Sequence, residues 1–170
     1  TPMNSSAASD VYKRQVTISD VPLPDHAAPK VYDATGQWVT PGFIETHSHY
    51  DAEVIATPSL KESVRHGVTS VLIGSCSISM IKAQPEDCSD LFTRVEAVPR
   101  EAVLPILKEK KTWRDAAGYR GFYDRQPLGP NVGSFVGHSD IRVAVMGLER
   151  ATSPAKPSEQ ELQKMESLLE

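Results

Sequence analysis

The chain reads Val-Thr-Pro-Gly-Phe-Ile-Glu-Thr-His-Ser-His-Tyr-Asp at residues 39–51, where a Pro-Gly break precedes a short apolar run and two histidines. Alternate side chains of a strand lie on the same face, so a strand over residues 43–50 would direct His47 and His49 to one side. Two neutral imidazoles at a strand end can bind a divalent metal such as zinc. A pair of exposed histidines beside a polar loop is the alternative, because such short motifs also occur without a metal.

A second apolar run, residues 68–74, is followed by Cys76, whose thiolate is another ligand that zinc accepts. Residues 59–66 between the two runs are predicted to form a helix. Gly67 would end it, because glycine readily adopts the left-handed conformation at a helix C-terminus. Strand, helix and strand in this order form one unit of a parallel sheet, and functional residues gather at the carboxyl edge of such a sheet.

Three parallel strands are predicted in all, at residues 43–50, 68–76 and 131–137, with helices between them. The fold class is therefore expected to be α/β. In a parallel sheet the carboxyl ends of the strands meet at one edge. We accordingly expect three side chains to converge there: His47, His49 and Cys76.

The remaining pattern predicts helices. The spacing of apolar side chains over residues 100–110 favours a helix. Thr112 is expected to cap a further helix, and residues 141–146 could continue the third strand or begin a short helix. Ser158 and Glu161 have the spacing of a capping box and predict the start of a last helix. Four aromatic side chains are expected to pack in the core rather than stack on a ligand: Trp113, Tyr119, Phe122 and Tyr123.

Two strings, residues 41–49 and 66–77, resemble blocks of the amidohydrolase superfamily, and more narrowly of the D-aminoacylases, or N-acyl-D-amino-acid deacylases. They read Pro-Gly-Phe-Ile-Glu-Thr-His-Ser-His and His-Gly-Val-Thr-Ser-Val-Leu-Ile-Gly-Ser-Cys-Ser. The blocks at residues 127–132 and 137–142 are similar as well, and the resemblance extends from about Val31 to the end of the chain. Three positions depart from the family pattern and leave the ligand types unchanged: Ser75 and Ser77 replace an asparagine and a glycine, and Glu45 stands where aspartate is common.

The resemblance implies a metal-dependent hydrolase with a (β/α) barrel of the TIM type, of which this chain would contain only the first strands. It implies that one or two divalent ions, with zinc as the expected metal, are bound by the three ligands His47, His49 and Cys76. The substrate would be an N-acyl-D-amino acid, cleaved at its linear amide bond to a carboxylate and a D-amino acid.

The resemblance also implies what lies around these ligands. The catalytic general base is expected beyond Glu170, so that this chain by itself would be inactive. Asp51 could orient a ligand or line the pocket, with a solvated loop carboxylate as the alternative. His138 matches no ligand of the family and is expected in a structural role or beside the ligands.

Three regions are expected along the chain. Residues 1–15 resemble a translated adapter sequence and are expected to be a non-native or disordered leader. Residues 16–40 contain a predicted turn at residues 33–36 between strand-like segments. The resemblance implies that they are the remnant of a small β-sandwich subdomain. Residues 41–170 would form the N-terminal part of the barrel.

Composition limits the other classes of function. The 170 residues carry a net charge of −4 and no basic block, which argues against a nucleic-acid partner or an anionic membrane surface. No apolar run approaches the ~20 residues of a membrane span, and the chain is shorter than the ~250 residues of a complete barrel. Two cysteines are too few for a disulfide framework, so Cys88 is expected to be a free thiol and the protein to be cytoplasmic.

Two alternative functions stay open. The chain could be a non-catalytic metal-binding or scaffold domain. It could also belong to a cyclic-amide hydrolase of the dihydropyrimidinase kind, although that class usually has a carboxylated lysine bridging its metals, and Cys76 in the ligand position argues against it. The sequence makes no prediction of the oligomeric state.

Overall fold

The computed structural model describes residues 6–10, 15–19 and 32–169, and the chain divides into two compact units, residues 1–40 and 41–170. In the first unit, β1 (Ser6–Asp10) pairs with β2 (Gln15–Ser19) as an antiparallel ribbon. The residues of β1 lie in the segment that was expected to be a leader without strands.

A turn follows in the first unit, one residue later than predicted. The Gln37 amide donates to the Ala34 carbonyl at 2.9 Å, and Gly36 has a positive φ of 75°. The prediction that residues 37–39 are strand-like is wrong, because they pair with no strand among the described residues. Most of the strand-like segment expected before the turn lies outside the described residues.

A three-stranded parallel sheet forms the centre of the second unit. Its strands are β3 (Phe43–Glu45), β4 (Val68–Ile73) and β5 (Asn131–Ser134), in the order β3-β4-β5. Both pairings are parallel, so the predicted α/β class and the three parallel strands are confirmed.

The strands are shorter than predicted, which changes where the expected ligands lie. β3 ends at Glu45 and β4 ends at Ile73, so the two histidines and Cys76 lie in the loops that follow the strands. The prediction that strand alternation directs His47 and His49 to one side is therefore wrong. The chain leaves β4 because Gly74 adopts a left-handed conformation with a φ of 79°.

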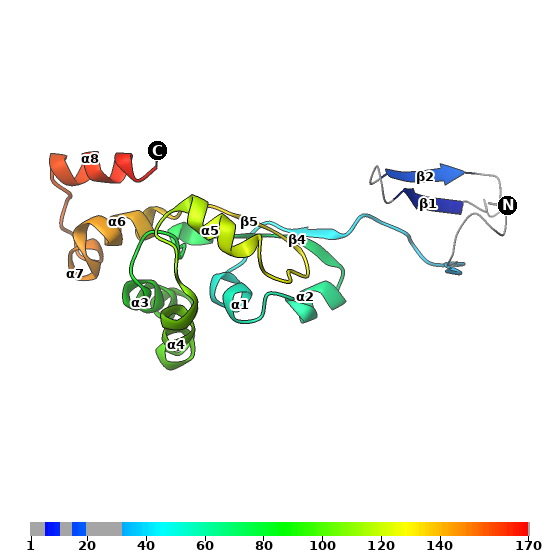
Figure 1. The fold of residues 1–170 in the computed structure, drawn as a ribbon, viewed down its shortest axis with the longest axis horizontal. Helices are drawn as coiled ribbons and strands as arrows, with labels where there is room; N and C mark the ends of the chain where they lie inside the picture. Colours follow the sequence, from blue (N-terminus) through cyan, green and yellow to red (C-terminus); the bar gives the residue numbers. More distant parts are fainter. Residues whose placement is uncertain (1–5, 11–14, 20–31, 170) are drawn as a thin grey trace. The chain divides into compact units, whose positions relative to one another are not determined.

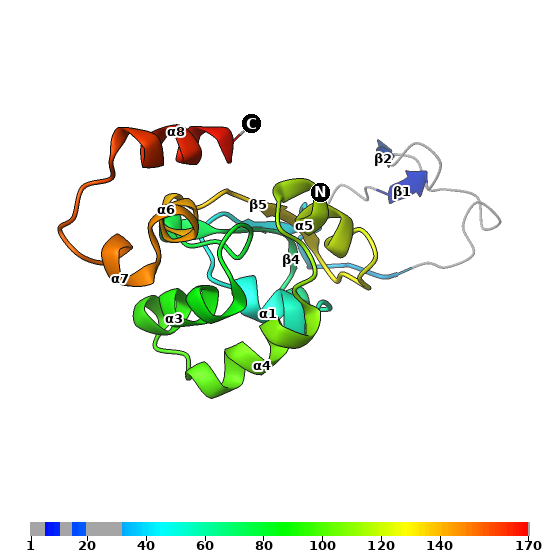
Figure 2. The same cartoon turned by 60° about the vertical axis from the view of Figure 1, so that its left-hand side comes forward.

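Helices connect and flank the strands, and α1, α3 and α4 lie together on one side of the sheet (Figures 1 and 2). The helices and one 3-10 turn of the second unit are α1 (Asp51–Ala56), α2 (Lys61–Arg65), η1 (Ser75–Ser77), α3 (Pro85–Glu96), α4 (Arg100–Lys110), α5 (Ala116–Tyr123), α6 (His138–Met146), α7 (Leu148–Ala151) and α8 (Glu159–Ser167). The helix predicted at residues 100–110 is confirmed. Residues 141–146 are helical, within α6.

Helix caps explain several of these boundaries. The Ser158 hydroxyl accepts from the Glu161 amide and the Glu161 carboxylate accepts from the Ser158 amide, which confirms the predicted capping box of α8. The prediction that Thr112 caps α5 is wrong. The helix begins three residues later than the sequence pattern suggested, so Asp115 is the cap, and its carboxylate accepts from the Gly118 amide at 2.7 Å.

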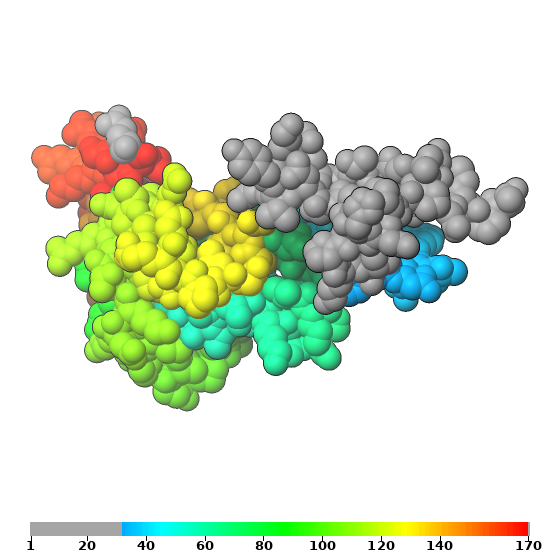
Figure 3. All heavy atoms as spheres, turned by 45° about the vertical axis from the view of Figure 1, so that its right-hand side comes forward, coloured from blue at the N-terminus to red at the C-terminus, as the bar shows by residue number. Residues whose placement is uncertain are grey.

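The predicted aromatic core is confirmed. Trp113, Tyr119, Phe122 and Tyr123 are all buried, and the ring centroids of Trp113 and Phe122 are 4.7 Å apart. The buried indole of Trp113 donates to the Met80 carbonyl at 2.8 Å, which ties this cluster to the loop after β4. Figure 3 shows the loop after α5 packed against the segment between α1 and α2. There the Gly129 amide donates to the Pro58 carbonyl at 3.2 Å.

A smaller apolar cluster joins α8 to α6. Met165 of α8 packs with Ile141 and Met146, whereas Leu162 and Leu169 are exposed, so only part of the apolar stripe of α8 is buried. In the part of the chain that the structure describes, no helix combines the length and the apolar character needed to cross a membrane.

Candidate metal centre

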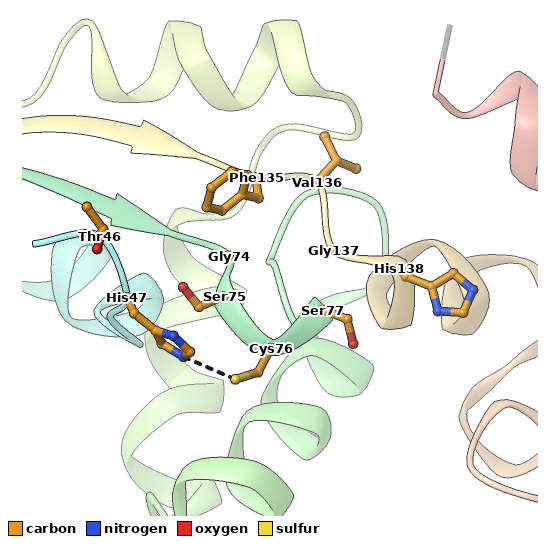
Figure 4. A pocket seen from close by; sticks show the side chains of 10 residues that line it. All are labelled: Thr46, His47, Gly74, Ser75, Cys76, Ser77, Phe135, Val136, Gly137 and His138. Atoms are coloured by element: carbon orange, nitrogen blue, oxygen red, sulfur yellow. Dashed lines mark hydrogen bonds between the residues drawn. The ribbon is translucent and has the colours of Figure 1, made fainter.

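Two histidines and a cysteine meet beyond the carboxyl ends of β3 and β4. His47 and His49 lie in the loop after β3, and Cys76 lies in the 3-10 turn after β4. One ligand atom from each of the three residues lies within 4.8 Å of the other two. His47 Nε2 lies 3.3 Å from Cys76 Sγ (Figure 4). The structure thus brings together the three residues that the sequence singled out, although their role as ligands stays a prediction.

The loop that carries the histidines is anchored to both strands. Ser48, which lies between them, is buried, and its hydroxyl donates to the Leu72 carbonyl of β4 at 2.9 Å. The His47 amide donates to the Glu45 carboxylate at 3.0 Å, which turns the chain out of β3. Sequence reasoning missed the role of Ser48, and only its position between the two histidines could have drawn attention to it.

The turn that carries Cys76 has an unusual backbone. Cys76 and Ser77 both have positive φ angles, 51° and 63°, and neither is glycine. A left-handed conformation costs a residue with a Cβ roughly 1–2 kcal/mol. Gly74 avoids this cost, and a Cβ there would lie 2.5 Å from the Phe135 carbonyl oxygen. The turn is therefore held by close backbone packing against the segment after β5.

A carboxylate faces the second histidine. His49 is mostly buried, and its Nε2 lies 3.4 Å from Oε1 of Glu96, the last residue of α3. Histidines that bind metals commonly donate their other ring nitrogen to such a carboxylate, which fixes the orientation of the ring. The Nδ1 atom of His49 is also buried and has no hydrogen-bond partner among the described residues. The sequence contained no local signal for Glu96.

Asp51 is a buried carboxylate at the start of α1, so the alternative of a solvated loop residue is wrong. Neither of its oxygens accepts a hydrogen bond of standard geometry from the described residues. Burial raises the pKa of Asp51 to about 7, the nearby amides of Gly74 and Asp51 itself oppose this in part, and the charges of Asp140 and Glu96 add to it. Asp51 does not line the cavity described next.

An open cavity of about 430 Å³ lies against His47 and Cys76 (Figure 4). Its lining residues are Thr46, His47, Gly74, Ser75, Cys76, Ser77, Phe135, Val136, Gly137 and His138. This volume is within the range of small-molecule sites. His138 is exposed at its edge, and its ring points away from His47 and Cys76, so His138 does not join the histidine and cysteine cluster.

Chemically, this donor set fits a divalent transition metal. Two imidazoles and one thiolate are typical zinc ligands, and the spacing of their donor atoms allows one ion to reach all three. The unpaired, buried Nδ1 of His49 supports the fit, because buried polar atoms without partners are rare in folded proteins.

The two cysteines are expected to react very differently with a thiol-specific disulfide reagent. Cys76 is exposed, whereas Cys88 is buried and its pKa is raised by burial and by the charge of Asp140. The thiolate is the reacting form, so in the native chain Cys88 should be labelled at least about 100-fold more slowly than Cys76. In denaturant the two cysteines should be labelled at similar rates. The release of the coloured leaving thiol measures both rates. Replacing Cys76 with serine should remove the fast phase only, and equal native rates would contradict the observed packing.

No protein-family model matches the chain. An uncharacterised protein of Mycobacterium tuberculosis is 55% identical over 155 residues, which cover 91% of this chain and 25% of that protein. The N-acyl-D-glutamate deacylase of Alcaligenes xylosoxydans xylosoxydans is 34% identical over 138 residues, which cover 81% of this chain and 25% of that enzyme. The chain therefore spans about a quarter of the length of these curated relatives.

One solved structure extends the comparison. The N-acyl-D-glutamate deacylase of Bordetella bronchiseptica, solved in complex with zinc and a phosphonate inhibitor, is similar with a TM-score of 0.56 and 27% sequence identity. The similarity covers 76% of this chain and 24% of that one.

Proposed function

Because this chain belongs to the amidohydrolase superfamily, and within it to the family of the D-aminoacylases and N-acyl-D-amino-acid deacylases, we propose that it supplies part of a metal-dependent site that hydrolyses N-acyl-D-amino acids. The observation that carries this proposal is the convergence of His47, His49 and Cys76 beside a cavity of small-molecule size. The expected products are a carboxylate and a D-amino acid.

The sheet supports this placement of the site. β3, β4 and β5 follow one another in space as they do along the chain, and all three are parallel. Successive parallel strands with intervening helices begin a (β/α) barrel, and barrel enzymes have their active sites at the carboxyl ends of the strands. We infer that these three strands open such a barrel, and that the candidate metal centre lies at its catalytic end.

Some residues of this chain would bind the metal, and others would form the wall of the substrate cavity. A divalent ion, when bound, would lower the pKa of a coordinated water and polarise an amide carbonyl. His47, His49 and Cys76 would hold that ion, and zinc is the metal that suits two imidazoles and a thiolate. Phe135 and Val136 form an apolar wall of the cavity, where the acyl group of a substrate would rest.

The cavity contains no carboxylate among its described lining residues. Hydrolysis of an amide needs a general base for the water and a proton for the leaving amine. We propose that this base lies outside residues 41–169, in the longer protein whose length the relatives indicate. The same observation favours one second candidate, a metal-binding domain without catalysis.

Metal binding and turnover together test the proposal. The 170-residue chain should bind one or two zinc ions per molecule in equilibrium dialysis and should not hydrolyse N-acetyl-D-glutamate or other N-acetyl-D-amino acids. The longest coding product that contains this chain should hydrolyse a D-substrate, prefer it to the L-enantiomer, and lose activity with a chelator. Metal binding without turnover in that longer product would support the second candidate, and absence of metal binding would contradict both.

A further inference from the structure

Asp140 is a buried carboxylate that the proposed site does not use. Its side chain is fully buried in α6, and it accepts four hydrogen bonds from the segment of residues 79–83. These come from the Ser79 hydroxyl at 2.7 Å and from the amides of Ile81, Lys82 and Ala83 at 2.8, 2.9 and 2.7 Å. A carboxylate that accepts several such bonds holds its partners more firmly than neutral acceptors do.

The start of α6 makes three further close contacts with the chain that follows Cys76. The Gly137 amide donates to the Ser79 hydroxyl at 3.0 Å, and the hydroxyls of Ser77 and Ser139 are 2.6 Å apart. A Cβ on Gly137 would lie 2.3 Å from the Ser77 carbonyl oxygen, so any other residue at this position would clash with the backbone of Ser77. Residues 77–83 are therefore attached to α6 at several points.

This attachment bears on Cys76 because the cysteine is exposed and its backbone is strained. Strained conformations persist only where the surrounding structure holds them. On one side of Cys76, Gly74 packs against the Phe135 carbonyl, and on the other side Ser77 begins the segment that α6 holds. The direction in which Cys76 presents its sulfur depends on both supports.

We propose that Asp140 is a positioning residue for the metal centre, which holds Cys76 facing His47 and His49 through the segment of residues 77–83. The proposal rests on the function proposed above, since it presumes that Cys76 binds the metal. Among the described residues, Asp140 makes no hydrogen bond to Cys76, His47 or His49. Its effect would pass through the backbone of one turn.

Cobalt(II) titration of the 170-residue chain tests this, because cobalt bound by a thiolate gives a charge-transfer absorption band that reports on the cysteine itself. Asp140→Asn keeps the size of the side chain but places an NH2 group opposite amide donors. We expect its cobalt affinity to fall about 10–100-fold, with a weakened thiolate band, as for other residues that orient metal ligands. A mere loss of stability elsewhere in the chain would not change this band.

Two control variants separate positioning from stability. Asp115→Asn changes another carboxylate that accepts a backbone amide, at the start of α5, and should leave affinity and band unchanged. Val103→Ala removes buried volume from α4 and should lower stability without altering the band. If Asp140→Asn does not fold, Ser79→Ala tests the positioning role in its place. This change removes the hydroxyl that links Gly137 to Asp140 and should lower the cobalt affinity about fivefold.

The outcomes are distinct. A wild-type chain without a thiolate band overturns the metal centre and this proposal with it. A wild-type band that Asp140→Asn, or Ser79→Ala in its place, leaves at full intensity and affinity overturns the positioning role alone. A weakened band in these variants, together with intact bands in Asp115→Asn and Val103→Ala, supports it.

Discussion

Replacing both His47 and His49 with alanine lowers the zinc affinity of the chain by more than about 100-fold, because loss of two ligands exceeds the 10–100-fold effect typical of residues that only orient them. The donor atoms of these histidines and of Cys76 lie within 4.8 Å of one another, so one ion loses two of three ligands from this chain. Titration with a competing chromophoric chelator measures the affinity. In the longest coding product that contains the chain, the same double change should abolish turnover.

His138→Ala is the matched control for this experiment. Its imidazole lines the same cavity but points away from His47 and Cys76. Affinity should therefore stay within about twofold of the wild type, because no ligand is lost. His47 is exposed and His49 is only partly so, and the double variant should keep its far-ultraviolet circular dichroism. A double variant that binds zinc as tightly as His138→Ala would show that the metal lies elsewhere.

Gly74→Ala should lower the free energy of unfolding by about 3–5 kcal/mol, from left-handed strain together with overpacking. Gly74 has a φ of 79°, and an added Cβ would lie 2.5 Å from the Phe135 carbonyl oxygen. Backbone atoms cannot rotate away as a flexible side chain can. The ends of β4 and β5 would have to separate, although the Phe135 amide donates to the Ile73 carbonyl there at 3.0 Å. Urea denaturation followed by tryptophan fluorescence measures the change.

Gly147→Ala provides the control for backbone conformation alone. Gly147 has a φ of 77° and a ψ of 155°, a conformation even less suited to alanine, but a Cβ added there would meet no described atom within 4 Å. Its cost should be about 1–2 kcal/mol. A cost of no more than about 1–2 kcal/mol for Gly74→Ala, the size of left-handed strain alone, would show that the contact between Gly74 and Phe135 does not constrain the native backbone.

Local patterns in the sequence carried much of the fold. The apolar runs at residues 68–74 and 131–137 became β4 and β5, and the capping box of Ser158 and Glu161 begins α8 as predicted. Such signals are reliable because they involve residues only a few positions apart. The repeat of a single helix or strand sets which of these side chains are buried and which of them can form hydrogen bonds with one another. The motif spacing also identified His47, His49 and Cys76 before their positions were known.

Local patterns failed where boundaries depend on contacts between distant segments. The sequence predicted that the strands would run through His49 and Cys76, but they end at Glu45 and Ile73. The Glu45 carboxylate takes the His47 amide, and Gly74 turns the chain toward the segment after β5. Neither interaction follows from the alternation of apolar and polar residues.

The sequence by itself determined the presence of three parallel strands and the identity of the three candidate ligands, since both follow from residue type and spacing along the chain. Only the tertiary structure decided which side chains support them. Ser48 bonds to a strand 24 residues away, and Asp140 bonds to a segment 57–61 residues away. Glu96 reaches His49 from the far end of α3. These partners are recognisable only after the chain has folded, because their hydrogen bonds and ion pairs join residues that are far apart in the sequence and meet only in the folded state.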